Sequence, residues 1–432
     1  MKSKTVQEFK ETEIGKIPID WDVRTIKECS SEEPYSTQIG PFGKALMSSE
    51  YTISGVPVLR GINVNLARFH DNDFVFVSKE KYNELKKFEA FPDDILLVHK
   101  GSIGKIGLMP LKRKFSHYLL GNSMMRVKCE KTILLPKFLY YWLSSVFGQN
   151  YLYSRISQVG VPQLQTPLRT LREAKLSLPS ITEQQQIVDT LFSVEESINN
   201  LKNQNKILEQ IAQAIFKSWF VDFDGVTEFE DSELGKIPKG WGVEKLADLC
   251  TTQYGYTESA SDQKIGPKFL RVTDMNKQPW INWNKVPYCK ITETNFKKYS
   301  LKQGDLVVSR MADPGKVGII EEDTDAVFAS YLVRLKVISI EQSYFIFYFI
   351  RSRKYLDYAE GISSGGSVQK NMNAKRITDI DLVKPSDEKI KLFFNLIYPF
   401  RIKITKINHQ IQSLTKTRDA LLPKLMSGEI RV

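Results

Sequence analysis

A glycine-rich loop of this 432-residue chain carries the residue types that hold phosphates or read the edges of bases. The loop reads HKGSIGKIG from His99 to Gly107. It resembles a phosphate-binding loop, but the GxxxxGK[ST] spacing is absent and Ile106 stands where a metal-binding hydroxyl would be required. The loop therefore predicts a basic hairpin that touches a phosphate backbone. An ordinary structural turn remains the alternative interpretation.

The same residue types recur in both halves of the chain. Arg, Lys, Gln, Asn, Ser and Thr on loops are typical of side chains that contact phosphates or base edges. The candidate DNA contacts are Arg60, Asn63, Lys100, Ser102, Lys105 and Gln163 in the first half, and Arg271, Thr273, Arg310, Lys316 and Gln369 in the second. Any one of them could equally be a solvated surface residue. Their recurrence in both halves favours a binding role.

Motifs that would indicate catalysis are incomplete. Asp93 and Asp94 precede an apolar run as in nuclease carboxylate motifs, but the run ends Val98-His99-Lys100 without a second carboxylate. Turn chemistry before a strand explains the pair better. The GxSxG match at residues 361–365 lacks the apolar strand that a nucleophile elbow needs. The sequence also lacks a GxGxxG loop for a methyl donor and an Asn/Asp-Pro-Pro-aromatic segment, so we expect no catalytic residue and no cofactor.

Composition indicates a globular, mildly basic protein. Lys and Arg number 61 against 50 Asp and Glu, a net charge of +11, which permits a polyanionic partner without establishing one. The four cysteines and four histidines show no metal-ligand spacing, so we expect no metal site. We find neither an apolar stretch long enough to span a membrane nor the apolar core of a signal peptide. These features predict a cytoplasmic protein.

The chain contains an internal repeat of about 210 residues. EIGKIPIDWDV at Glu13–Val23 returns as ELGKIPKGWGV at Glu233–Val243, and GKIG at Gly104–Gly107 returns as GKVG at Gly315–Gly318. The offset drifts from 220 to 211 and then 206 residues, as insertions in loops would cause. Two long copies are too few for a solenoid. A duplicated unit is therefore predicted.

Each copy reads as an α+β domain followed by one long helix. Short apolar runs such as Phe74–Val77 and Ile95–Val98, separated by Pro and Gly, predict short strands. A helical patch follows at residues 136–147, with its counterpart at residues 343–356. Apolar residues then alternate at spacings of four and three, which is a heptad seam. Its members are Ile187, Leu191, Val194, Ile198, Leu201, Leu208 and Ile215 in the first copy, and Ile397, Phe400, Ile404, Ile407, Ile411, Leu414 and Leu421 in the second.

The two long helices are expected to pair as an antiparallel coiled coil with pseudo-two-fold symmetry. Packing of each helix on its own domain is the alternative. Thr182 is the predicted cap of the first helix, with Gln185 three residues on as in a capping box. Pro399 and Pro423 predict a kink or a break in the second helix.

These features together resemble the specificity subunit of type I restriction-modification systems, over nearly the whole chain. The resemblance rests on the repeated GKIPxxW, on IGPFG at residues 39–43 and on GKIG at residues 104–107. It rests also on LPSITEQQQIV from Leu178, AIFKSWFVDF from Ala214 and TRDALLPKLMSGEI from Thr417. The second copy departs from the pattern, with Gln253-Tyr254-Gly255-Tyr256 in place of a clear GPFG.

The resemblance implies target recognition domains at residues 1–180 and 223–386, and conserved helical regions at residues 181–222 and 387–432. Each domain would read one half of a bipartite, asymmetric site in double-stranded DNA, and the helices would set the spacer. The chain would recruit two adenine methyltransferase subunits and ATP-dependent restriction subunits, and would itself be non-catalytic. The alternatives are a standalone methyltransferase or nuclease, and a coiled-coil adaptor that does not read DNA.

Overall fold

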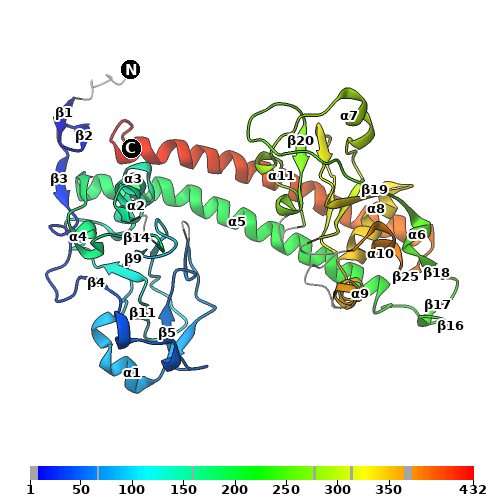
Figure 1. Cartoon of the computed structure of the whole chain (residues 1–432), viewed down its shortest axis with the longest axis horizontal. Coiled ribbons are helices and arrows are strands. Elements are labelled where there is room, and N and C mark those ends of the chain that lie inside the picture. Colours follow the sequence, from blue (N-terminus) through cyan, green and yellow to red (C-terminus); the bar gives the residue numbers. More distant parts are fainter. Residues whose placement is uncertain (1–7, 66–67, 158–159, 276–278, 312–314, 364–371) are drawn as a thin grey trace. The chain divides into compact units, whose positions relative to one another are not determined.

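The computed structural model describes residues 8–65, 68–157, 160–275, 279–311, 315–363 and 372–432. The chain folds into two compact units. Unit 1 comprises residues 1–198 and 413–432, and unit 2 comprises residues 199–412. The long helices α5 (Ile181–Phe220) and α11 (Asp387–Met426) each contribute to both units (Figure 1).

Unit 1 is built on a four-stranded antiparallel sheet of order β10-β9-β12-β4 and a three-stranded sheet of order β11-β5-β8. The strands of the larger sheet are β4 (Thr37–Ile39), β9 (Ile95–Val98), β10 (Ile106–Leu108) and β12 (Met124–Val127). Those of the smaller sheet are β5 (Val56–Leu59), β8 (Val75–Val77) and β11 (Leu119–Leu120), with β5 parallel to β11. The two-stranded pairs are β1 (Phe9–Thr12) with β2 (Gly15–Pro18), β3 (Asp22–Thr25) with β15 (Lys175–Leu178), β6 (Val64–Asn65) with β7 (Arg68–Phe69), and β13 (Ile156–Ser157) with β14 (Gln163–Leu164). The helices are α1 (Lys79–Glu84), α2 (Pro136–Ser144), α3 (Val146–Tyr153) and α4 (Pro167–Arg172).

Unit 2 repeats this topology. Its larger sheet, β22-β21-β24-β19, matches β10-β9-β12-β4 strand for strand, and its parallel pair β20-β23 matches β5-β11. The strands are β16 (Phe229–Ser232), β17 (Gly235–Pro238), β18 (Gly242–Lys245), β19 (Cys250–Tyr254), β20 (Lys268–Leu270), β21 (Leu306–Ser309), β22 (Val317–Ile319), β23 (Ala326–Phe328), β24 (Leu332–Val337) and β25 (Asp381–Lys384). The helices are α6 (Leu246–Leu249), α7 (Glu293–Tyr299), α8 (Ile340–Ile350), α9 (Arg353–Ser363) and α10 (Ala374–Thr378). The predicted α+β class and duplication are confirmed.

An ion pair with a buried aspartate recurs at the centre of each larger sheet. Asp94 pairs with Arg126 at 3.1 Å in unit 1, and Asp305 pairs with Arg334 at 3.2 Å in unit 2. Each aspartate also closes a turn ahead of its strand, because its Oδ2 accepts a hydrogen bond from the backbone N–H three residues earlier. The interpretation of the Asp93-Asp94 run as turn chemistry is confirmed.

The tryptophan of each GKIPxxW motif packs the first segment of its copy against one end of helix α5. Trp21 is fully buried and its Nε1–H donates to Glu183 on α5 at 3.0 Å. Trp241 is half-buried against the rings of Phe220 and Phe223, at centroid distances of 6.0 and 5.8 Å. The repeated motif is therefore explained by packing.

Helices α5 and α11 each run for 40 residues, about 60 Å. The cap of α5 is Ser180, whose Oγ accepts from the Glu183 N–H at 3.3 Å. The prediction of Thr182 is wrong, because that residue already lies inside the first turn. Ser386 caps α11 in the same way. A break at Pro399 or Pro423 is also wrong, since the helix continues through both and its flanking turns are held by buried apolar side chains.

The two helices pack together in antiparallel fashion (Figure 1). In unit 2, Asn205 Nδ2 donates to Asn408 Oδ1 at 2.8 Å, and Glu209 pairs with Arg401. The residue number thus rises along α5 from Asn205 to Glu209 while that of its partner on α11 falls from Asn408 to Arg401, so the two helices run in opposite directions. All the predicted seam residues lie in the described part of the chain, and each is buried or half-buried. The ends of α5 also enter the core of the unit that each belongs to, so the two packing alternatives are both realised.

Candidate nucleic-acid interface

The loop between β9 and β10 in unit 1 meets the hairpin of β13 and β14. Lys100 and Gln163 form an isolated β-bridge, and Gly101 N–H donates to Pro162 O at 2.8 Å. The side chains of Lys100, Ser102 and Gln163 are exposed. Three predicted contacts, one of them distant in sequence, therefore lie on one loop cluster.

Lys105 connects this cluster to the loop after β5. Its Nζ donates to Gly61 O at 3.2 Å, next to the predicted contact Arg60. Arg60 is half-buried, and its Nη2 donates to Asp73 O at 2.8 Å. The structure thus brings Arg60 and Lys105 to the same side of unit 1 as Lys100 and Gln163.

Asn63 is one of the predicted DNA contacts, but in the structure its side chain bonds within its own unit. It is fully buried. Its Oδ1 accepts from Arg60 N–H at 2.9 Å, and its Nδ2 donates to Asn72 O at 2.7 Å. The side chain therefore holds the Arg60 loop in shape.

Asp274 takes the place of Asn63 in unit 2. It accepts from the backbone N–H of Arg271 at 2.9 Å, as Asn63 does from that of Arg60. It also holds the Arg271 guanidinium with two hydrogen bonds of 2.9 Å, and these raise the pKa of the arginine. Arg271 is thus a charge already paired within its own loop, and the exposed Thr273 lies beside it.

The loop after β21 matches the loop after β9. The N–H of Met372 donates to Arg310 O at 2.8 Å, as the N–H of Leu164 donates to His99 O. Lys316 is half-buried in the turn that precedes β22. Gln369 lies outside the described residues.

A glycine supports the corner after the outer strand of each larger sheet. A Cβ built on Gly40 would lie 1.9 Å from Gly121 O, and one on Gly255 would lie 2.2 Å from Ala329 O. Neither position can hold a side chain unless the backbone moves. Gly255 is therefore the structural counterpart of Gly40, a match that the sequence left unclear because the neighbouring residues differ.

An aromatic ring near each glycine lies against the first residue after the central hairpin strand, which is β9 in unit 1 and β21 in unit 2. In unit 1, Phe42 lies 6.3 Å from the His99 ring, measured between centroids. In unit 2, Tyr254 lies 5.0 Å from the Arg310 guanidinium. Sequence reasoning missed this pairing because Phe42 follows its glycine by two residues whereas Tyr254 precedes its own.

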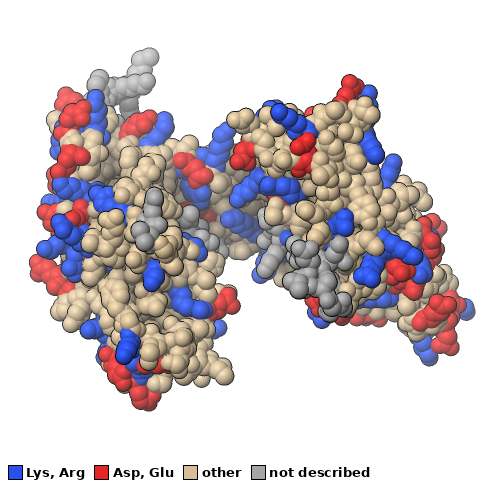
Figure 2. All heavy atoms as spheres, in the orientation of Figure 1, with Lys and Arg blue, Asp and Glu red and all other residues tan. Residues whose placement is uncertain are grey.

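Charge alone does not mark the interface. Lys and Arg are interspersed with Asp and Glu over the face in view (Figure 2). The geometry of the loop clusters is thus the stronger argument for binding.

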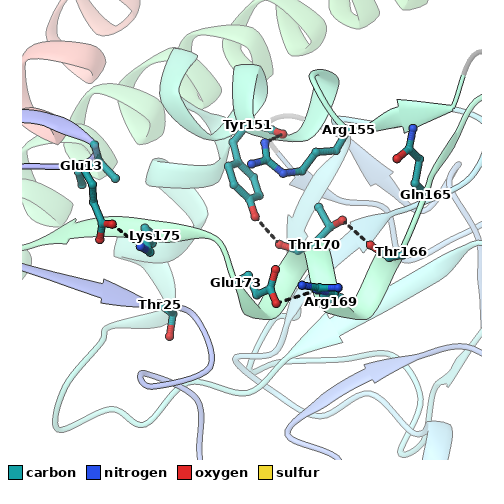
Figure 3. A pocket seen from close by; sticks show the side chains of 11 residues that line it. Glu13, Thr25, Tyr151, Arg155, Gln165, Thr166, Arg169, Thr170, Glu173 and Lys175 are labelled. Carbon is teal, nitrogen blue, oxygen red and sulfur yellow. Dashed lines mark hydrogen bonds and ion pairs between the residues drawn. The ribbon is translucent and has the colours of Figure 1, made fainter.

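A polar cavity of about 760 Å³ in unit 1 is a second candidate site (Figure 3). Its charged side chains already have partners: Lys175 pairs with Glu13, and Arg169 pairs with Glu173 at 2.8 Å. Arg155 donates to Tyr151 O at 3.1 Å and lies over the Tyr151 ring. A charged cofactor would therefore have to displace interactions that the unit makes with itself.

Within the residues that the structure describes, no group of three or more His, Cys, Asp and Glu side chains is placed to hold a metal ion. Burial raises the pKa of the thiols of Cys29, Cys250 and Cys289 to about 11, so they stay protonated near neutral pH. Across the same described ranges, every helix is too short or too polar to cross a membrane.

Comparison with known proteins gives a consistent picture. The family model described as "Type I restriction modification DNA specificity domain" matches residues 37–211 and again residues 238–416. The MjaIX specificity subunit of Methanocaldococcus jannaschii is 30% identical over 98% of this chain and 97% of its own length. The HindI specificity subunit of Haemophilus influenzae is 24% identical over 73% of this chain and 82% of its own. The crystal structure of the S subunit from M. genitalium shares the fold, with a TM-score of 0.56 and 17% identity over 94% of this chain and 96% of that one.

Proposed function

Because the chain belongs to the type I restriction-modification specificity subunits, which are non-catalytic, we propose that it reads a bipartite, asymmetric sequence in double-stranded DNA. Residues 1–180 would read one half of the site and residues 223–386 the other. One observation carries this proposal: the same strand order occurs twice, with different side chains on matching loops. Duplicated scaffolds with unlike loops suit the reading of two unlike half-sites.

The exposed and half-buried members of the loop clusters supply the contacts. In the first half-site these are Arg60, Lys100, Ser102, Lys105 and Gln163, and in the second they are Arg271, Thr273, Arg310 and Lys316, with Gln369 as a further candidate. Lysines would contribute salt-sensitive phosphate contacts, and Gln and Arg would discriminate bases. Asn63 would act indirectly, by shaping the Arg60 loop.

The helical regions at residues 181–222 and 387–432 would set the unread spacer and recruit partners. Those partners are two adenine methyltransferase subunits and ATP-dependent restriction subunits, working on DNA in the cytoplasm. A target base must be flipped out of the duplex before methyl transfer. That chemistry would belong to the methyltransferase subunits, and this chain would position them on the sequence.

Mapping of modified adenines by long-read sequencing tests the proposal, in host cells with this gene intact and deleted. Deletion should remove one asymmetric bipartite motif from the methylated set. If the chain binds a methyltransferase but the set is unchanged on deletion, the proposal fails. If the assembled complex shows no sequence-dependent binding to DNA, the coiled-coil adaptor alternative is favoured.

A second experiment tests the spacer. Removal of about one heptad from each of α5 and α11 keeps the seam in phase, since the pattern repeats every seven residues. The recognised spacer should become shorter while both half-sites stay the same. An unchanged spacer would contradict a measuring role for the helices.

A further inference from the structure

Phe42 is an exposed aromatic side chain within the loop cluster of unit 1. It is 61% exposed. It lies between β4 and a short 3-10 turn at Gly43–Ala45. An aromatic ring left in water on a loop forgoes the burial that normally stabilises it, so a partner that covers it would gain apolar contact.

The backbone holds this ring in one place. On one side, Gly40 N–H donates to Met124 O at 2.8 Å, and Gly40 lies too close to Gly121 O to carry a side chain. On the other side, Ala45 N–H donates to Phe42 O at 3.1 Å, and the next residue, Leu46, is buried. The loop is pinned at both ends, so little conformational entropy is lost when a ligand meets the ring.

The surroundings of the ring point to DNA as the partner. Phe42 packs against His99, and the next residue, Lys100, is exposed and bridged to Gln163. Burial lowers the pKa of His99, so its ring stays neutral at the same spot. The exposed Phe42 ring thus lies against a buried, neutral histidine, and the residue after that histidine is a lysine bridged to a glutamine. This combination can contact a base edge and the backbone together.

We propose that Phe42 packs against the 5-methyl group of a thymine in the half-site read by unit 1. The inference rests on the proposed function and deepens it. In the major groove the thymine methyl is the apolar feature of the base-pair code, and it is read by apolar side chains such as Phe. Unit 2 has Arg310 where unit 1 has His99, with Tyr254 against the guanidinium, so the methyl contact belongs to unit 1.

Uracil substitution tests this contact, because uracil is thymine without the methyl group. The full chain is assembled with its methyltransferase subunits, and affinity is measured on duplexes in which one thymine of the half-site at a time is replaced by uracil. One position should cost the wild-type complex about fourfold in affinity, the value of burying one methyl group. Phe42→Ala should lose at least as much on unmodified DNA and should be insensitive to uracil at that position.

Ile53→Ala is the matched control, since that side chain is 97% exposed in the loop before β5. It should bind every duplex as the wild type does. Phe42→Leu should keep most of the affinity and the uracil sensitivity, because it retains an apolar surface.

The outcomes separate this inference from the proposed function. If Phe42→Ala binds like the wild type while the complex still prefers its bipartite site, the Phe42 inference is wrong and the proposed function stands. If Phe42→Ala is weaker but remains sensitive to uracil at every position where the wild type is, the thymine contact is wrong. If the wild-type complex shows no sequence preference, both fail.

Discussion

The corners after β4 and β19 show how two halves of one chain share a scaffold and differ in chemistry. Both corners turn on a glycine that faces a backbone carbonyl too closely to carry a side chain, Gly40 in unit 1 and Gly255 in unit 2. The residue beside each corner is neutral in unit 1, His99, and cationic in unit 2, Arg310. Backbone geometry is thus fixed by sterics in both units, while the side chains beside it differ between them.

The junctions between head and helix differ more strongly. In unit 2, Arg401 is buried between Glu209 and Glu321, and Tyr348 Oη–H donates to Glu209 at 3.2 Å. In unit 1, Glu195 on α5 accepts from Tyr141 Oη–H at 2.9 Å. An arginine therefore links head and helix in both units, but Arg401 in unit 2 is fully buried, whereas Arg431 in unit 1 is exposed and pairs with the buried Glu183 and the exposed Asp20.

The largest expected effect comes from breaking the buried network of unit 2. Arg401→Met leaves the carboxylates of Glu209 and Glu321 without their main partner, which should cost about 3–5 kcal/mol of unfolding free energy. Arg418→Met in unit 1 removes a half-buried arginine that pairs with the exposed Asp419, and should cost about 1 kcal/mol or less. Denaturant unfolding with hydrogen exchange in each unit would measure both. Equal losses would contradict the contrast between the junctions.

The next effect concerns the shared glycine. Gly255→Ala forces a Cβ against Ala329 O, so we expect a loss of about 1–3 kcal/mol in unit 2 and weaker binding of its half-site. Gly361→Ala is the control, because a Cβ there meets no atom within 4 Å and the residue lies in helix α9. Thermal unfolding and binding to DNA with one half-site scrambled would separate the two effects. If both variants behave alike, the corner glycine is not a steric requirement.

A smaller effect is expected from Arg271→Ala. The guanidinium is already held by Asp274, so its loss should weaken binding to the second half-site by only about 1 kcal/mol, the low end for a base contact. The first half-site is the internal control and should be read unchanged. Equal damage to both half-sites would instead indicate a general phosphate contact or misfolding.

A separate effect is a pH dependence in unit 1. Burial raises the pKa of Asp94 to about 6, partly offset by Arg126, and its Oδ1 has no hydrogen-bond partner in the described structure. Because this value lies above that of the unfolded chain, the folded unit binds the proton more tightly. Its unfolding free energy should therefore fall as the pH rises from about 4 to about 6. Unfolding of the wild type and Asp94→Asn across this range checks the slope. A slope that survives in the variant would assign it to another group.

The sequence predicted those features that depend on pattern. The repeat, the short strands and the paired helices follow from residue spacing, because periodicity decides which face is buried. It predicted Thr182 as the cap where the structure has Ser180, because both residue types accept the same hydrogen bond. It could not see that Asn63 is buried or that Arg271 is paired, because both depend on how a loop folds back on itself.

The match of Gly255 with Gly40 escaped for a related reason. Only the approach of a carbonyl from the residue after another strand, Gly121 in unit 1 and Ala329 in unit 2, reveals what the two glycines have in common. Loop positions are therefore the part of such a site that a repeat pattern predicts least well, and they carry the proposed reading chemistry.

Independent reading by the two units is the central claim, and selection of bound sequences from randomised DNA tests it most directly. The experiment compares the wild-type chain with Phe42→Ala and Arg310→Ala, each assembled with its methyltransferase subunits. Each variant should relax one half of the bipartite motif, and the two should relax opposite halves while the spacer stays constant. If either variant alters both halves, or both alter the same half, the assignment of one half-site to each unit is wrong.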